Sequence, residues 1–391
     1  MASKRNLFSA LIIVSAMLTF GCKKEGDTTT STGGATKVEG DVIKIGEVGS
    51  LTGNEATFGT STHNGIELAI KEQNAAGGIN GKKIELTTLD NQGKPEEAAT
   101  AITKLITQNK VVAVLGEVAS SRSIAMAPIA QQYGIPMVSP SSTNPQVTAL
   151  GDYIFRVCFI DPFQGQVMAK FALDTLKVKK VAILRDVRND YSVGLANYFI
   201  ETFKAGGGEI VVDQSYSAGD VDFKAQLTAI REKKPEAVFV PGYYTEVGLV
   251  ARQAKELGLN VPLMGGDGWD SPKLTEIGGK SIEGSYFSNH YSHEDKAVYV
   301  QDFIKKYKAD YKVIPDGLAA MGYDAAKVLF EAMKKSPGLT TKEIRDQLAL
   351  TKDYQGVTGK ITINEKRDAV KSAVVLRVDK DGFKYQTTVA P

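Results

Sequence analysis

Short apolar runs alternate with segments of helical periodicity along most of the chain. The runs IKIGEV, IELTTL, VVAVLG and IPMVS lie in the first half, and KKVAIL, EIVVD, AVFVPG and PLMGG lie in the second. Their apolar residues are nearly continuous, which is typical of strands that are buried on both faces. Because parallel strands are joined by crossover helices, this alternation predicts an α/β fold with parallel sheets.

The same succession of elements occurs twice. The segments from Gly65 to Gly116 and from Gly194 to Gly242 each begin with a helical pattern that stops at a Gly-Gly pair. Each then continues through a β-rich run and a second helical pattern to a buried strand. The repeat predicts two doubly wound parallel-sheet lobes, and the roughly 370 residues that follow the N-terminal segment are natural for two domains.

The N-terminal segment has a different pattern. A basic start is followed by an uncharged run that ends in Leu18-Thr19-Phe20-Gly21-Cys22. A run of about 15 residues is shorter than a membrane span and fits a secretory signal peptide. The residues before Cys22 resemble the lipobox of bacterial lipoproteins. We therefore expect removal of residues 1–21 and a lipid anchor on Cys22; a buried strand or a signal peptide without lipidation are the alternatives.

Composition narrows the class of protein. Residues 22–41 are rich in Thr, Gly and Ser, so we expect a flexible tether there. The whole chain is 42% hydrophobic and 24% charged, which is ordinary for a globular protein. Its formal charge of +2 comes without a basic stripe, which argues against nucleic acid as a partner. Cys158 is the only cysteine besides Cys22, so no intrachain disulfide is expected in the mature protein.

Candidate chemistry lies in the segments that follow the predicted strands. Ligands of open parallel sheets bind beyond the carboxyl ends of the strands. These segments are GSLTGNEATFG, GEVASSRS and SPSSTNP in the first half, and RDVRNDYS, PGYYTE and GGDGWDS in the second. Two lobes whose segments of this kind face each other would form a cleft.

The two sets of segments differ in their side chains. The first set supplies hydroxyl groups, and Ser120 precedes a helical pattern whose free N–H groups and dipole favour an anion. The second set supplies aromatic rings and Asp267, an acid suited to a cation. Taken singly, a Ser or Thr after a strand is more often a helix N-cap, and Gly266-Asp267-Gly268 is more often a turn. Together they favour a small zwitterion, of which an α-amino acid is the obvious example.

Motifs for catalysis or metal binding mostly fail. Gly59–His63 approaches a nucleophile elbow but ends in His where Gly is needed, and AGGINGKK lacks the first Gly and the last Ser or Thr of a phosphate loop. His290 and His293 have no clear third ligand, so we interpret them as part of a solvated turn. Few groups remain for acid–base catalysis. We expect a protein without a cofactor or metal that is not an enzyme.

Several of these segments, taken in order, resemble the leucine/isoleucine/valine-binding family, the type I periplasmic binding proteins of ABC importers. They are IKIGEVGSLTGNEATFG, NGIELAIKEQNAAGGINGKKIEL, SPSSTNPQVT, GYYTEVGLVARQAKELG and GGDGWDSPKL. The resemblance implies a three-strand hinge, with residues 43–160 and 290–371 in the N-terminal lobe and 161–289 and 372–391 in the C-terminal lobe. It also implies permease subunits as partners and a location in the periplasm or at the cell surface.

The resemblance implies roles for individual residues as well. The α-carboxylate of an amino acid would bind Ser120 and Thr143. The ammonium would bind the carbonyl of Ser141, the Thr143 hydroxyl and Asp267, while Tyr243 closes from the second lobe. The ligand's side chain would be lined by Phe58, Val118, Ala119, Tyr191 and Leu318.

Four positions depart from the branched-chain binders. Asp267 stands where they have Glu, Phe58 replaces a Tyr, Leu318 stands where a Phe is found, and Trp269 is expected to add bulk near the mouth of the cleft. A branched-chain or related apolar amino acid remains the first expectation. The alternatives are an amide, a short carboxylate or an aromatic acid on the same fold, and a sensor that presents its ligand state to a membrane receptor.

Overall fold

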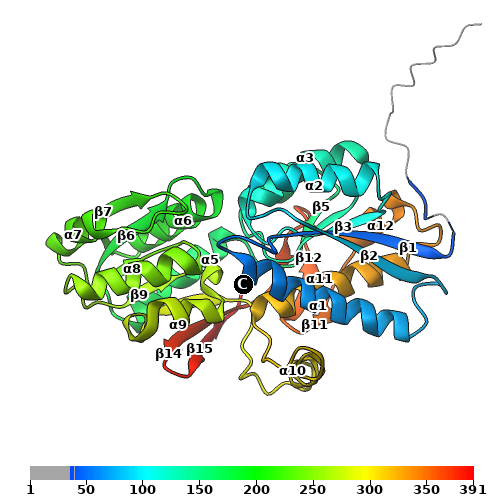
Figure 1. Ribbon diagram of the computed structural model, residues 1–391. Helices are drawn as coiled ribbons and strands as arrows, with labels where there is room; N and C mark the ends of the chain where they lie inside the picture. The colour runs from blue at the N-terminus through cyan, green and yellow to red at the C-terminus, as the bar shows by residue number, and fades with distance from the viewer. Residues whose placement is uncertain (1–35, 39) are drawn as a thin grey trace, which may run out of the picture. The chain divides into compact units, whose positions relative to one another are not determined.

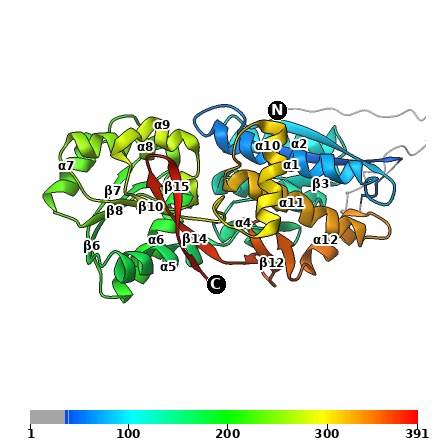
Figure 2. The same ribbon diagram turned by 90° about the horizontal axis from the view of Figure 1, so that it is seen from below.

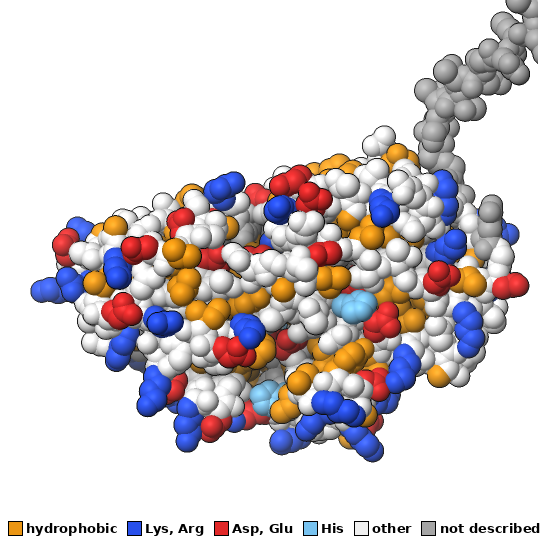
Figure 3. Space-filling view, viewed as in Figure 1, with side chains coloured by type: hydrophobic (Ala, Val, Ile, Leu, Met, Phe, Trp, Pro, Cys, Tyr) orange, Lys and Arg blue, Asp and Glu red, His pale blue; other side chains and the backbone are white. Residues whose placement is uncertain are grey.

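The computed structural model describes residues 36–38 and 40–391, so the predicted signal peptide and Cys22 lie outside the described residues. The described residues belong to one compact unit that contains two α/β lobes, each with its own sheet (Figure 1). Among them, no helix combines the length and apolar character needed to cross a membrane. Acidic and basic side chains are interspersed on the face shown in Figure 3, in keeping with the small formal charge of +2.

The first lobe is built on a parallel sheet with the strand order β2-β1-β3-β4-β5. Helices α2 and α3 cover one face of this sheet, whereas α1, α11 and α12 cover the other (Figure 1). The strands are β1 Val42–Gly49, β2 Lys83–Asp90, β3 Ala113–Leu115, β4 Met137–Ser139 and β5 Ile154–Arg156. The helices are α1 Ala56–Ala75, α2 Pro95–Thr107, α3 Ser120–Tyr133, α4 Gln146–Ala149, α10 Val298–Tyr311, α11 Gly317–Lys334 and α12 Thr341–Ala349.

The second lobe has the strand order β15-β14-β10-β9-β8-β6-β7. Helices α5 and α6 lie on one face of its sheet, and α7, α8 and α9 lie on the other (Figure 2). The strands are β6 Lys180–Asp186, β7 Glu209–Tyr216, β8 Ala237–Phe239, β9 Leu263–Gly265, β10 Tyr286–Asn289, β14 Ala373–Asp379 and β15 Gly382–Val389. The helices are α5 Asp161–Lys170 with a π-helical end at Phe171–Thr175, α6 Asp190–Ala205, α7 Lys224–Glu232, α8 Tyr244–Glu256, α9 Pro272–Gly278 and short 3-10 turns at Asp267–Trp269 and Gly279–Ser281.

The sequence repeat is a repeat of topology. The orders β2-β1-β3-β4-β5 and β7-β6-β8-β9-β10 are equivalent, and both sets of strands are parallel. This confirms the predicted α/β fold with two doubly wound lobes. The prediction of parallel sheets was incomplete, because β14 and β15 add an antiparallel edge to the second sheet. A separate antiparallel sheet consists of β11 Tyr354–Gly356, β12 Gly359–Ile363 and β13 Ala369–Val370.

The chain passes between the lobes at three places. It passes between β5 and α5, again after β10 ends at Asn289, and finally between β13 and β14. The crossovers predicted near residues 160, 290 and 371 fall in these connections, while the residue bounds of each lobe stay a prediction. The connections bring the carboxyl ends of both sets of parallel strands toward one region.

Local sequence accounts for several helix ends. Pro95 occupies the first turn of α2, followed by Glu96 and Glu97, which suits the positive end of the helix dipole. Thr340 and Glu343 form a reciprocal capping box at the start of α12. At the end of α3, Gly134 adopts φ of 62°, a left-handed cap that glycine accepts readily.

A close helix pair supports the first lobe. Helices α1 and α11 pack together, and Gly65 of α1 faces the backbone of α11. A Cβ atom at Gly65 would lie 2.0 Å from the carbonyl oxygen of Ala319. Since two backbones rather than a flexible side chain would have to move apart, this position requires glycine.

The substitution Gly65→Ala should therefore destabilise the protein. We expect a loss of about 1–3 kcal/mol in the free energy of unfolding, measured by urea denaturation, because the two helices must separate to admit the methyl group. Gly49→Ala is the matched control, since its Cβ would meet its nearest atom at 3.6 Å, an ordinary contact. Equal stability of the two variants would contradict this explanation.

Candidate functional site

Segments from the carboxyl ends of the strands in both lobes enclose one cavity. Eight of the nine residues that line it were singled out from the sequence, and the ninth is Gly268. The lining consists of Phe58, Val118, Ser120, Ser141, Tyr191, Tyr243, Asp267, Gly268 and Leu318. The structure thus brings residues more than 200 positions apart in the chain to one place, while their roles stay a prediction.

The side chains pack tightly around this cavity. They leave about 240 Å³ between them, of which only about 10 Å³ can hold the centre of a water-sized sphere. That is about the space of a single water molecule. A ligand of the size of an amino acid therefore requires the lobes, or the side chains that line the cavity, to move apart.

The first lobe presents donors to the cavity. Helix α3 starts at Ser120, so the free N–H groups of its first turn lie beside the cavity. The Ser120 hydroxyl accepts a hydrogen bond from the Asn144 N–H at 3.2 Å, which leaves its own hydrogen to donate. The Thr143 hydroxyl is fully buried beside the Asp161 carboxyl and does not line the cavity. Such a set of donors suits a carboxylate.

A buried acid holds the strand-end loops of the first lobe together. Glu117 is fully buried, and its Oε1 accepts hydrogen bonds from Ser50 at 2.7 Å and Asn91 at 3.0 Å. Its other oxygen accepts from the N–H of Ala119, directly before α3. One carboxylate therefore connects the loops after β1, β2 and β3 and fixes the start of α3.

A buried arginine fixes the neighbouring loop. Arg156 is fully buried and donates from its guanidinium to the carbonyl of Ser142, between Ser141 and Thr143. Its charge is balanced by Asp368, whose carboxylate lies 2.7 Å from Nε of Arg156. Such a pair is costly to break because a single charge would remain buried. The hydroxyl-bearing loop is thereby held in a rigid position.

The second lobe contributes the acid. Oδ1 of Asp267 accepts a hydrogen bond from the Tyr191 hydroxyl at 3.0 Å. Oδ2 accepts from the hydroxyl of Ser141, in the first lobe, at 3.1 Å, and lies 3.0 Å from Nε2 of His290. The backbone N–H of Asp267 donates to Gln164 at 2.9 Å. The acid is therefore buried and held from several sides, with a link across the cleft.

Aromatic rings form the walls around the acid. Tyr243 stacks on Tyr191 with ring centroids 5.4 Å apart. Phe58, from the first lobe, meets Tyr243 edge to face at 5.3 Å and Tyr244 at 5.1 Å. The contacts of Phe58 join the two lobes, and the rings together shield the acid from bulk water, which strengthens the electrostatic interactions around it.

The structure places three of the predicted residues away from the cavity lining. Trp269, expected near the mouth of the cleft, is instead fully buried in the core of the second lobe, where its Nε1–H donates to the carbonyl of Val240 at 3.0 Å. The indole fills the space beside Gly265, which only a glycine leaves open. Ala119 borders a neighbouring groove, and Thr143 is fully buried and does not line the cavity.

The interpretation of His290 as part of a solvated turn was wrong. Its side chain is 1% exposed and contacts Asp267. His293 is not part of this contact, and the described residues contain no group of three or more His, Cys, Asp or Glu arranged to hold a metal ion. Sequence spacing did not reveal His290 because the second crossover, rather than a helix or strand pattern, brings it to the acid.

Asp161 is a second acid that the sequence did not indicate. It begins α5 and is fully buried, and its N–H donates to the carbonyl of Thr143 at 2.9 Å. Burial raises the pKa of the Asp161 carboxyl to about 8, and the charge of Asp267 adds to the rise. Asp161 is therefore protonated at neutral pH.

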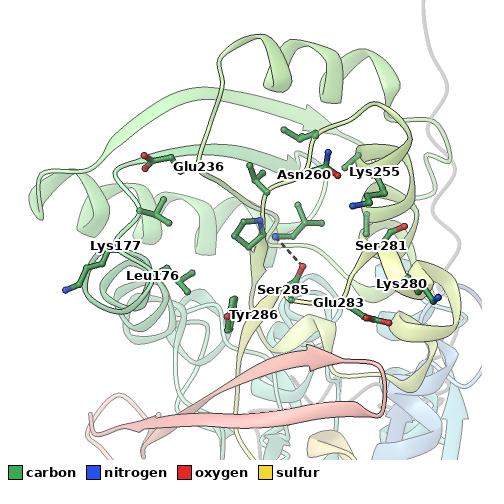
Figure 4. Close-up of a pocket in the computed structure, with 18 residues that line it drawn as sticks. Leu176, Lys177, Glu236, Lys255, Asn260, Lys280, Ser281, Glu283, Ser285 and Tyr286 are labelled. Carbon is green, nitrogen blue, oxygen red and sulfur yellow. Dashed lines mark hydrogen bonds between the residues drawn. The ribbon is translucent and has the colours of Figure 1, made fainter.

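A larger hollow lies at the opposite end of the second sheet. It measures about 620 Å³ and is lined by residues that precede β6, β8, β9 and β10, among them Lys177, Glu236 and Ser285 (Figure 4). Lys177, Glu236 and Lys280 point outward around the rim (Figure 4). Because ligands of such sheets bind beyond the carboxyl ends of the strands, this hollow is not the candidate site.

The chain is similar to known binding proteins. A family model described as periplasmic binding protein matches residues 42–383. A Leu/Ile/Val-binding protein of Rhizobium johnstonii is 32% identical over 346 residues, which is 85% of this chain and 90% of that protein.

Solved structures of similar proteins contain ligands. A branched-chain amino acid transporter substrate binding protein of Streptococcus pneumoniae, solved with isoleucine, is 36% identical with a TM-score of 0.85, covering 90% of this chain and 100% of that one. A solute binding protein of an ABC transporter from R. palustris, solved with benzoate, is 25% identical with a TM-score of 0.82, covering 90% and 97%.

The raised pKa of Asp161 predicts how stability depends on pH. Between about pH 4 and pH 8 the folded protein keeps a proton that the unfolded chain has lost, so the free energy of unfolding falls as the pH rises, by at most about 1.4 kcal/mol per pH unit. Asp161→Asn should remove this pH dependence. The free energy of unfolding of the variant, measured by urea denaturation, should therefore rise relative to that of the wild type from pH 5 to pH 8. The exposed Asp302→Asn serves as control. If the difference in the free energy of unfolding between Asp161→Asn and the wild type were the same at every pH, the raised pKa of Asp161 would be contradicted.

Proposed function

The chain belongs to the periplasmic binding protein family, and we propose that it binds an apolar α-amino acid, branched-chain or similar, between its lobes. The members of this family bind substrates for ABC transporters and are not enzymes. The observation that carries this proposal is the arrangement of the cavity, with a buried acid from one lobe and a set of donors from the other.

The acid supports an ammonium group as one end of the ligand. Asp267 is buried, and the hydrogen bonds that reach its carboxylate come from hydroxyl groups and an imidazole. Burying an ion costs several kcal/mol unless another charge compensates it. A ligand ammonium would supply this charge, with the carbonyl of Ser141 and the hydroxyl of Thr143 as further acceptors.

The donors of the first lobe support a carboxylate at the other end. The first turn of α3, the Ser120 hydroxyl and the Thr143 hydroxyl provide hydrogen bonds, and the helix dipole adds a favourable field. Between the two ends, the cavity is lined by the apolar side chains of Val118, Leu318 and Phe58. This lining suits a branched aliphatic side chain, as in the relative solved with isoleucine.

Closure of the lobes on a hinge supports capture of the ligand. Hydrogen bonds between lobes join Thr57 to Ser271 at 2.9 Å and the Thr245 hydroxyl to the carbonyl of Asn54 at 2.8 Å. The three connections between the lobes provide the pivots. A ligand that contacts both lobes favours the closed arrangement, because only that arrangement allows all of its contacts at once. Release to permease subunits of an importer would follow reopening.

An aromatic or short carboxylate is the second candidate. The relative solved with benzoate and the rings of Tyr191, Tyr243 and Phe58 favour it. Such a ligand would occupy the donors of the first lobe but leave Asp267 without a counterion. The amino acid is therefore the better fit to the cavity.

Asp267→Asn tests the amino-acid proposal by isothermal titration calorimetry. We expect L-leucine or L-isoleucine to bind the wild type, and the variant to bind at least about 2 kcal/mol more weakly, roughly 30-fold, because the amide cannot balance the ammonium. 4-Methylpentanoate, which has the shape of leucine without the amine, should bind the wild type more weakly than leucine.

Asp186→Asn is the matched control, since Asp186 is a buried acid of the same lobe outside the cavity lining. This variant should keep the affinity of the wild type for leucine. Tight binding of benzoate or 4-methylpentanoate, with no measurable binding of amino acids, would favour the second candidate.

Cys22→Ser tests the proposed lipid anchor in the full chain expressed in a bacterial host. The wild type should partition with membranes and carry an acylated N-terminal Cys22 by mass spectrometry, whereas the variant should be released. Cys158→Ser should stay with the membrane, because Cys158 is buried in the first lobe. Membrane association of Cys22→Ser equal to wild type would contradict the anchor.

A further inference from the structure

His290 contacts the acid of the cavity from the second crossover. It follows β10 directly, and its Nε2 lies 3.0 Å from Oδ2 of Asp267 and 3.5 Å from the hydroxyl oxygen of Ser141. Its ring lies against Phe159, with centroids 3.7 Å apart. His290 thus touches groups from both lobes where the chain passes between them.

The surroundings of His290 favour its neutral form. Nε2 carries the hydrogen, because a carboxylate can only accept. Nδ1 is buried and has no hydrogen-bond partner among the described residues, so a second N–H at that atom would lack an acceptor. Burial lowers the pKa of His290; Asp267 opposes this effect, and Lys371 adds to it.

Asp267 differs in this respect from two other buried acids of the chain, Glu55 and Asp368. Glu55 pairs with Arg122 at 2.8 Å, and Asp368 pairs with Arg156 at 2.7 Å. Those acids are neutralised by a guanidinium within the protein. With a neutral imidazole as its partner, Asp267 is oriented by hydrogen bonds while its charge stays available.

We propose that His290 is a positioning residue, which orients Asp267 through a neutral hydrogen bond and leaves the carboxylate's charge for the ammonium of the ligand. It thereby sets the selectivity of the cavity for an amine over a ligand of the same shape that lacks one. This inference rests on the proposed function and names the residue that gives the site its preference for an ammonium group.

The role makes binding dependent on pH. An imidazolium would compete with the ligand's ammonium for the same carboxylate, so the protonated form of His290 binds the amino acid more weakly. Affinity for L-leucine should therefore fall as the pH drops below the pKa of His290, which lies below 6.5. The limiting slope is about tenfold per pH unit. Asp161, with a pKa of about 8, stays protonated over the range from pH 7 to pH 5.

The test compares His290→Gln and His290→Phe with wild type by calorimetry from pH 7 to pH 5, using L-leucine and 4-methylpentanoate. Gln keeps an N–H donor and cannot titrate, so it should bind leucine within about threefold of wild type at pH 7 and lose the pH slope. Phe keeps the ring contact and removes the donor, so it should lose at least about tenfold for leucine and far less for 4-methylpentanoate.

His63→Gln is the matched control, because His63 pairs with Glu47 at 2.7 Å outside the cavity lining. His63→Gln should show the same dependence of L-leucine affinity on pH as the wild type. If the affinity of His290→Gln for L-leucine still fell with decreasing pH, the proposal would be overturned. Equal losses of affinity for L-leucine and 4-methylpentanoate in His290→Phe would also overturn it. The pH dependence of His290→Gln decides the question even where the Phe variant does not fold. Failure of the wild type to bind any amino acid would reject the proposed function itself, which is a different result.

Discussion

The negative charge of Asp267 is the constraint around which the two lobes are arranged. A carboxylate removed from water is costly unless an opposite charge compensates it, and its hydrogen bonds come from neutral groups of Tyr191, Ser141 and His290. These bonds orient the carboxylate without neutralising it. Since Ser141 belongs to the first lobe, the full set of contacts exists only when the lobes meet. A cation bound at this point would stabilise the closed arrangement, so recognition and closure are two aspects of one equilibrium.

The first lobe is the rigid partner in this arrangement. Glu117 connects three strand-end loops, and Arg156 holds the loop that carries Ser141 and Thr143. Both side chains are fully buried and hydrogen-bonded, so we expect the donors of the first lobe to keep their positions when the lobes move apart. A pre-formed set of donors lowers the entropic cost of binding. The second lobe adds an acid and large rings, which complete the cavity on closure.

The topology could be predicted from the sequence because each buried strand leaves a nearly continuous apolar run, and the repeat from Gly65 and Gly194 places the runs in equivalent order. The segments at the strand ends followed from the same rule, whereas the resemblance to the family named Phe58, Val118 and Leu318. Trp269 was misplaced because its neighbours in the sequence line the cavity, while its own indole needs a buried acceptor that the sequence does not show. His290 was missed because it lies on a connection between the lobes, and Asp161 because it begins the helix directly after one, where no periodic pattern shows which side chains meet.

The division of chemistry between the lobes also determines the order of contacts. Phe58 has no polar atom, and the hydroxyl of Tyr191 is already bonded to Asp267, so these two walls offer no donor to a carboxylate. The donors at that end, from the first turn of α3 and from Ser120, belong to the first lobe. Under the proposed function, a carboxylate would therefore bind an open first lobe, and an ammonium on the same molecule would then draw in the acid of the second lobe. A ligand with a carboxylate alone would occupy the first lobe without this second attraction, so discrimination arises at closure rather than at the first encounter.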